Sequence, residues 1–263
     1  MALEGEYDMQ KQDKDLAARI AGGAKLAAGD ALTPGYRAEL MRLMVVLADS
    51  ELAGAAGFCP YVNRGPGLRE RIVAAKIVAE KYVHAELVLD LLKAFGVEPQ
   101  LYVRSHAWDS RLDRNVDLGT RRIGGDKRLN VFHYPLEGWE DAVTFNMLMG
   151  MATAVQLAEM QDCSYTPLAG AIATLLSRER EHAALGEAGV KQAIERTGSR
   201  SATQTAVDYW LPRVAATFGR EDSAHADVYI QYGLRRRGNA DMLADWRDQT
   251  EAALKRLGLK ASF

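Results

Sequence analysis

The sequence predicts an all-α protein, built on four long helices with additional helices at its C-terminal end. Segments that alternate between apolar and polar residues, as strands do, are nearly absent, and Val, Ile and Thr lie mostly inside Ala- and Leu-rich runs with a helical period. The long apolar segments form two pairs separated by a long irregular connection. This arrangement is typical of a four-helix bundle, in which each helix turns one apolar face toward a shared core.

The length fits one large domain or two small ones, and the composition is that of a globular protein. The chain has 263 residues, and we expect a polar N-terminal segment at 1–33 followed by a single helical domain at 34–263. The net charge of -2 gives no electrostatic reason to expect a nucleic acid or an anionic membrane as a partner. The charged N-terminus lacks the apolar core of a secretory signal, and no run of 18 apolar residues occurs. We therefore expect a soluble cytoplasmic protein.

The first helix is expected over about 34–58. Pro34 suits its first turn, because a proline there forfeits no intrahelical hydrogen bond. Its apolar residues recur at spacings of three and four: Leu40, Leu43, Met44 and Leu47. The stretch 58–67 is rich in proline and glycine, and we expect it to break the helix from Pro60 onward.

The second helix is expected over about 68–95, where Gly96 and Pro99 form a stop signal. An irregular excursion with short helical pieces should follow at 100–137, and long excursions inside a compact domain are usually functional. The second pair of helices is expected at about 139–161 and 168–197. Three further helices should complete the chain, at about 201–218, 223–236 and 240–257.

Glutamate and histidine recur on these helices at the spacing of a carboxylate-bridged metal site. Glu179 and His182 lie three residues apart, so they share one helix face and can reach the same metal ion. The first helix supplies Glu51, and the second supplies His84. Oxygen ligands with a few imidazoles suit iron or manganese, and these residues predict a non-haem iron site. The alternatives are a Glu–His pair on a solvated helix and a histidine that belongs to the core.

Two positions depart from a complete di-iron pattern. Lys81 stands three residues before His84, where a glutamate would be needed, although Glu80 lies one residue earlier and still shares the face. On the third helix the spacing points to 145–149, where only Asn146 carries an oxygen donor. Glu159 is a poor substitute, since it stands beside the break at 163–167. An ammonium group among carboxylates replaces a cation electrostatically, so a metal-free, salt-bridged cluster is the alternative to an iron centre.

These residues, with the motifs around them, resemble those of the catalytic subunit of the multicomponent phenylacetyl-CoA epoxidase. That subunit belongs to the phenylacetic-acid catabolic branch of the ferritin-like proteins. The resemblance covers roughly 35–250 and rests on segments that occur in the same order: Ser50–Glu51, RGPGLRERIVAAK at 64–76, His84, VFHYPLEGWEDA at 131–142, CSYTP at 163–167, REREH at 178–182 and WLP at 210–212.

The resemblance implies a ferritin-like fold and a di-iron epoxidase that uses dioxygen and electrons from a separate reductase. It also implies an aromatic CoA-thioester substrate and a partner subunit of the same fold without a working metal site. The positions that match the family's metal ligands are Glu51, His84, Glu179 and His182. We add Glu80 as a further candidate ligand, and Lys81 and Asn146 as further site residues.

Two functions remain open at this point. The first is an oxygenase subunit of phenylacetate catabolism with a degenerate di-iron site. The second is a metal-free structural or ligand-binding subunit without oxygenase activity. In either case the resemblance favours a homodimer or a hetero-oligomer.

The excursion carries six basic residues that could meet the phosphates of a CoA-type ligand: Arg111, Arg114, Arg121, Arg122, Lys127 and Arg128. The alternative is a solvated loop in which neighbouring aspartates balance these charges.

Overall fold

The computed structural model describes residues 2–121 and 123–263, with side chains from residue 11 onward. Within these ranges the chain forms helices and no strand. Four long helices form the core: α2 (Pro34–Val62), α3 (Leu68–Lys93), α5 (Gly138–Met160) and α6 (Thr166–Thr197). The remaining α-helices are α1 (Ala2–Ala21), α4 (Pro99–Arg104), α7 (Ser201–Ala215), α8 (Ala224–Gln231) and α9 (Asn239–Leu257).

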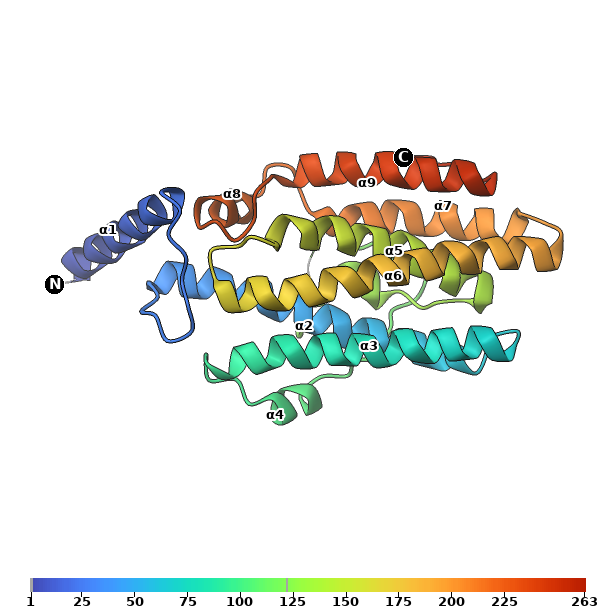
Figure 1. The fold of residues 1–263 in the computed structure, drawn as a ribbon, viewed down its shortest axis with the longest axis horizontal. Helices are drawn as coiled ribbons and strands as arrows, with labels where there is room; N and C mark the ends of the chain where they lie inside the picture. The colour runs from blue at the N-terminus through green and yellow to red at the C-terminus, as the bar shows by residue number, and fades with distance from the viewer. Residues whose placement is uncertain (1, 122) are drawn as a thin grey trace.

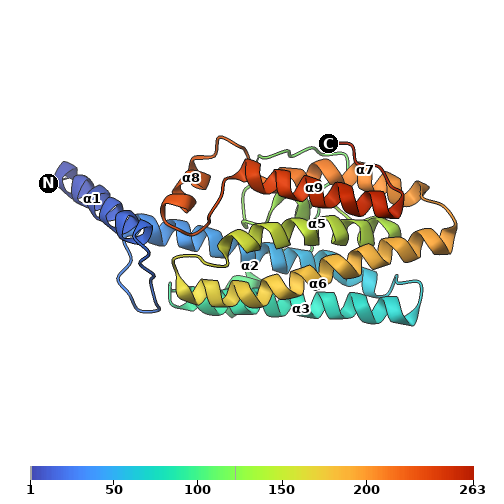
Figure 2. The same cartoon turned by 45° about the horizontal axis from the view of Figure 1, so that its top comes forward.

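The core helices pack as two pairs, α2 with α3 and α5 with α6, which lie side by side in an elongated bundle (Figure 1). Helices α7 and α9 cover the side of α5 that faces away from α2 and α3 (Figure 2). The predicted all-α bundle with additional C-terminal helices is therefore confirmed. The excursion between the two pairs carries α4 and a 3-10 helix at Asn130–His133, as the expected short helical pieces.

Helices α5 and α6 approach each other closely because glycines stand at their contact. A Cβ atom on Gly186 would lie 2.5 Å from the backbone nitrogen of Met147. On the other helix, a Cβ on Gly150 would lie 3.0 Å from the Cα of Ala183. The glycine-mediated contact fixes how deeply α6 sits against α5, and it therefore sets where α6 places its functional side chains.

Helix α2 is the central helix of the first pair. It is long and apolar enough to cross a membrane, but 56% of its most apolar stretch is buried, as in a core helix. Three consecutive polar residues, Asp49, Ser50 and Glu51, are also buried on it. The expected break at Pro60 is wrong, because the helix continues to Val62. Buried Tyr61, whose hydroxyl donates to the carbonyl of Leu136, holds this last turn in place although Pro60 cannot donate a backbone hydrogen bond.

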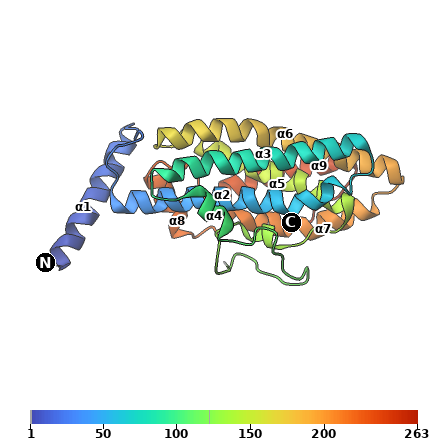
Figure 3. The same cartoon turned by 90° about the horizontal axis from the view of Figure 1, so that it is seen from below.

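The N-terminal segment, expected to be polar, contains helix α1, which extends beyond the end of the bundle (Figure 3). Leu16, Ala17 and Ile20 near its C-terminal end are buried in the same core cluster as residues of α2. Leu26 also belongs to this cluster, and its backbone pairs with Ser164 and with Thr166 at the start of α6. The chain before α2 therefore contributes to the core.

The excursion is attached to α2 by its buried polar residues. Asp49 accepts hydrogen bonds from the Tyr102 hydroxyl at 2.7 Å and from the Lys127 backbone at 2.5 Å. The Ser50 hydroxyl accepts one from the Leu129 backbone at 3.1 Å. Burial raises the pKa of Asp49, against the lowering effect of these hydrogen bonds. The same short stretch of α2 therefore positions the excursion and, one residue later, the candidate site.

The arginines of the excursion were expected either to meet the phosphates of a ligand or to lie in a solvated loop. Three of them do neither. Arg111 donates to the carbonyl of Ala53, and Arg114 binds Asp141 through both terminal nitrogens. Arg128 is 2% exposed and bound to Asp126. Arg128 is buried and the other two are partly buried, and all three hold the excursion in place through contacts within the chain. Arg122 lies outside the described residues.

Candidate functional site

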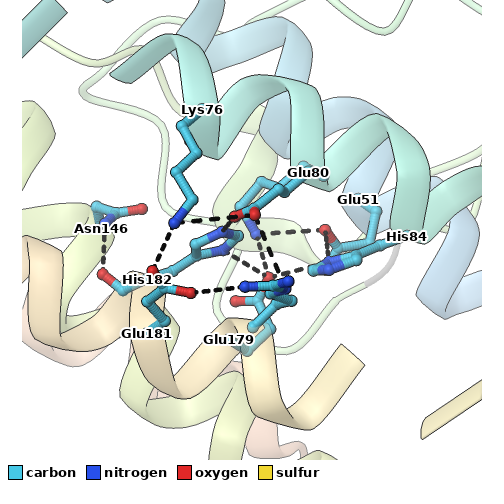
Figure 4. A network of polar contacts seen from close by, with 10 residues as sticks. Glu51, Lys76, Glu80, His84, Asn146, Glu179, Glu181 and His182 are labelled. Atoms are coloured by element: carbon cyan, nitrogen blue, oxygen red, sulfur yellow. Dashed lines mark hydrogen bonds and ion pairs between the residues drawn. The ribbon is translucent and has the colours of Figure 1, made fainter. Parts of the chain in front are cut away.

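The predicted site residues from three helices meet at one buried point between the two helix pairs (Figure 4). Helix α2 supplies Glu51, and α6 supplies Glu179 and His182. Helix α3 supplies Glu80, Lys81 and His84 within little more than one turn. Residues three or four apart share a helix face, which is why these spacings bring the side chains together. Glu51, His84, Glu179 and His182 are all buried.

Lys81 lies between two carboxylates of this cluster. Its Nζ is 2.9 Å from Glu179 Oε1 and 3.3 Å from Glu51 Oε2, and the side chain is only 12% exposed. Burial by itself lowers the pKa of Lys81, but the attraction of Glu179 and Glu51 outweighs it and raises that pKa above its usual range. Lys81 is therefore an ammonium ion in the centre of the site.

His84 contacts the same two carboxylates. Its Nδ1 lies 3.5 Å from Glu51 Oε2 and 3.4 Å from Glu179 Oε1, at the edge of hydrogen-bonding range, so the contacts are ion pairs rather than well-formed hydrogen bonds. Burial opposes the charged form, but the two carboxylates raise the pKa of His84 to about 9. Near neutral pH a second cation therefore stands beside Lys81.

Glu179 is the common partner of the cluster. Its Oε1 lies within 3.4 Å of Lys81, His84 and the Nδ1 of His182. Burial favours the neutral carboxyl group, but Lys81 and the two imidazoles hold the pKa of Glu179 well below its usual range. The other ring nitrogen of His182 lies 2.7 Å from Glu80 Oε2. Glu80 thus connects the buried cluster to the surface.

A surface network, which the sequence interpretation missed, covers the outer side of the cluster. Lys76 and Arg178 both bind Glu181, and both also face Glu80 at 4.0 and 3.8 Å. Two sequence signals were available for it. Lys76 stands four residues before Glu80, and the motif at 178–182 contains Arg178 and Glu181.

Helix α5 adds no carboxylate to the cluster. The side-chain amide of Asn146 donates to the backbone carbonyl of His182 at 3.0 Å, so it joins two helices instead of offering an oxygen to the site. Glu159, the other residue considered on this helix, is bound by Arg237 at 2.8 and 3.0 Å. The sequence therefore predicted the position of Asn146 near the site, but its side chain serves helix packing.

The donor set does not fit a two-metal centre. Glu51, His84 and Glu179 each offer an atom within 4.8 Å of the others, which matches a site for a single ion. However, Lys81 hydrogen-bonds the two carboxylates whose lone pairs a metal would need. Two divalent ions also require more negative charge than three glutamates supply, and α5 contributes none. A metal could enter only after the Lys81 ammonium is displaced or deprotonated.

A bundle in which three long helices bring glutamates and histidines to one buried point defines a ferritin-like carboxylate-bundle protein. The family described as Phenylacetic acid catabolic protein matches residues 9–262, and the chain belongs to this family. A curated relative from Escherichia coli (strain K12) is one of the subunits of 1,2-phenylacetyl-CoA epoxidase. The two are 23% identical over 252 residues, which cover 94% of this chain and 76% of the relative. The resemblance seen in the motifs is thereby confirmed.

Proposed function

We propose that this protein is a metal-free, non-catalytic subunit of phenylacetate catabolism, in which Lys81 takes the place of the metal. The observation that carries the proposal is the position of the Lys81 ammonium, 2.9 Å from Glu179 and 3.3 Å from Glu51. In this proposal the bundle serves as a structural or ligand-binding partner, and oxygen chemistry takes place on another subunit.

The charges of the cluster support this function. With Lys81 and His84 protonated, two cations face Glu51 and Glu179 in the buried centre. A buried carboxylate is strongly destabilising unless it is paired, and here both carboxylates are paired without a metal. The bundle can therefore fold and keep its site assembled in the absence of any ion.

Family membership supports the biological setting. The E. coli relative is named as one subunit of a 1,2-phenylacetyl-CoA epoxidase. By analogy, we infer that this chain assembles with a partner of the same ferritin-like fold, and that the complex acts on an aromatic CoA thioester in the cytoplasm.

A second candidate function is an iron-dependent oxygenase subunit. It is favoured by the group of Glu51, His84 and Glu179, whose donor atoms lie within 4.8 Å of one another, and by the likeness to the E. coli epoxidase. This function requires Lys81 to leave the carboxylates, so that the same oxygen atoms can bind iron.

The experiment that tests the proposal is elemental analysis of the protein after growth in iron-rich medium and after anaerobic reconstitution with ferrous iron. We expect no bound iron in the unchanged protein and a gain of bound iron in Lys81→Glu. Lys76→Glu is the matched control, because it makes the same charge change on the same helix outside the centre. Stoichiometric iron in the unchanged protein, with reductant-dependent oxygen consumption, would establish the oxygenase function instead.

A further inference from the structure

The outward face of α3 carries an apolar stripe with no covering element in the described part of the chain. The stripe consists of residues at helical spacings of three and four, all exposed: Leu68, Ile72, Ala75, Ala79, Tyr82 and Val83. Leu68 is 76% exposed and Ile72 is 59% exposed. Helix α3 lies along the outer edge of the bundle, so this face points away from α2 and α6 (Figure 2).

Large exposed apolar side chains are concentrated on the stripe and are sparse elsewhere in the described molecule. Eight large apolar side chains are exposed in the described residues, and four of them lie on the stripe. The core-facing side of α3 has its own buried apolar residues, including Ile77, Ala85 and Val88. The stripe is therefore not needed for packing within the chain. Contiguous exposed apolar surface of this kind marks an interaction site.

We propose that the α3 stripe binds the α3 stripe of a second copy of this chain, with the two helices antiparallel. A two-fold axis near residues 77 and 78 places Ile72 of each copy opposite Val83 of the other. The same register brings Ala75 of one copy within about one residue step of Ala79 of the other at the centre, where small side chains let the two backbones approach. The contact is isologous, as in most symmetric dimers.

Charges beside the stripe favour the antiparallel orientation. Arg69 and Arg71 flank its N-terminal half, and Glu86 and Asp90 follow its C-terminal end. In the antiparallel register Arg69 of one copy meets Glu86 of the other, whereas a parallel pair would oppose like charges. Within the described side chains neither Arg69 nor Glu86 has an ion pair, so both remain available for a partner. Asp90 already pairs with Lys93 on its own helix.

The extent of the stripe sets the expected strength of the dimer. Residues 68–83 span about 22 Å of helix at ~1.5 Å per residue. One helix-to-helix contact of this length lies at or below the ~800 Å² per partner of a standard interface. We therefore expect a dimer that dissociates in the micromolar range, rather than an obligate one.

Sedimentation velocity on the purified full chain, from about 1 to 100 μM, tests the dimer. We expect the mass to rise toward twice the 28.9 kDa of one chain. Ile72→Glu should weaken the association at least ~10-fold, because a charge would be buried in the contact. Ile230→Glu, the same change at a 39% exposed isoleucine on α8, is the control and should leave it unchanged. Circular dichroism checks that both variants fold.

The register is tested by charge reversal and by cross-linking. Arg69→Glu and Glu86→Arg should each weaken the dimer, and the double variant should restore it. In a Cys59→Ser background, a mixture of Ile72→Cys and Val83→Cys proteins should form an intermolecular disulfide under mild oxidation, and each protein alone should not. The removal of Cys59 matters because it is exposed.

Three results would overturn the proposal. They are a monomer at 100 μM, a dimer insensitive to Ile72→Glu, and a double charge reversal that fails to restore association. If a protein of different sequence covers the stripe instead, the purified chain will be monomeric. None of these measurements depends on metal content or activity. The dimer can therefore be disproved while the proposed metal-free function stands, and the metal-free function can be disproved while the dimer stands.

Discussion

The ammonium of Lys81 on α3 and the carboxylate of Glu179 on α6 lie 2.9 Å apart in the interior of the bundle. Lys81 also reaches Glu51 on α2, so one side chain connects three of the four core helices. Apart from this cluster, α3 and α6 share a modest contact compared with the extensive contacts within each pair. The lysine is therefore an electrostatic link between the two halves of the bundle, and it determines how the site responds to substitution.

Replacing Lys81 with methionine should lower the free energy of unfolding by about 3–5 kcal/mol at neutral pH. The change keeps the length of the side chain but leaves Glu51 and Glu179 without their central cation, and breaking a buried ion pair costs this much. Urea denaturation monitored by circular dichroism measures the loss. Lys76→Met is the control, since Lys76 is 41% exposed and an exposed pair contributes under about 1 kcal/mol. Equal losses in the two variants would contradict the central role of Lys81.

Stability should decline as the pH rises through 9, owing to His84. Its pKa is raised in the folded protein from 6.5 to about 9, so its contribution is complete below pH 6.5 and is lost as the pH passes the folded value. The contribution is on the order of 3 kcal/mol. Urea unfolding at pH 6, 7.5 and 9.5 should show the difference between the unchanged protein and His84→Gln shrinking as the pH rises. Parallel pH profiles for the two proteins would show that His84 is not charged in the fold.

Two glycines on α6 should respond to alanine in opposite directions. A Cβ on Gly186 meets the backbone of Met147 at 2.5 Å, so Gly186→Ala should force α5 and α6 apart and lower stability by about 1–3 kcal/mol. Gly170 is exposed on the same helix, and its Cβ would meet nothing within 4 Å. Gly170→Ala should raise stability by about 0.5–1 kcal/mol through helix propensity. Thermal unfolding of the two variants tests this. A loss of stability in both would mean that the close contact with Met147 is not the reason why Gly186→Ala is destabilising.

Asp49→Asn should loosen the excursion without unfolding the bundle. The asparagine can still accept from the Lys127 backbone and donate to the Tyr102 hydroxyl, but both hydrogen bonds lose the negative charge of the carboxylate, at a cost of about 1 kcal/mol. Hydrogen exchange followed by mass spectrometry should show faster exchange in 105–130 and unchanged protection in α5 and α6. Tyr102→Phe removes a single donor and serves as the milder comparison. Faster exchange throughout the chain would contradict this, because it would show that Asp49 stabilises the whole bundle rather than the excursion alone.

Helix periodicity and stop signals predicted most of the fold. The fourth core helix was expected at about 168–197 and is observed at Thr166–Thr197, where Gly198 takes the left-handed conformation that ends it. The helix expected at 223–236 ends earlier, at Gln231. Errors arose where tertiary contacts override local preference, as at Pro60, where buried Tyr61 maintains the last turn. Helix α1 was missed because charged and polar residues dominate its sequence up to Asp15.

The candidate site was predictable where it depends on spacing within one helix. Glu179 and His182 share a face by periodicity alone, and the structure brings them together. Glu80 also faces the cluster, but it meets His182 of α6 rather than His84 of its own helix. The direction of a single side chain depends on how helices pack, which no local pattern records. For this reason the amide of Asn146 could not be assigned to the His182 carbonyl, nor Arg237 to Glu159, before the fold was known.

The run Asp49–Ser50–Glu51 has a consequence for how this chain can vary in length. Successive residues of a helix are turned by about 100°, so the three side chains leave α2 in different directions, two toward the excursion and one toward the cluster. Inserting or deleting one residue just before this run would rotate all three contacts out of place at once. Tolerated insertions and deletions should therefore gather in the excursion itself and in the segments between the C-terminal helices, and be absent from the middle of α2.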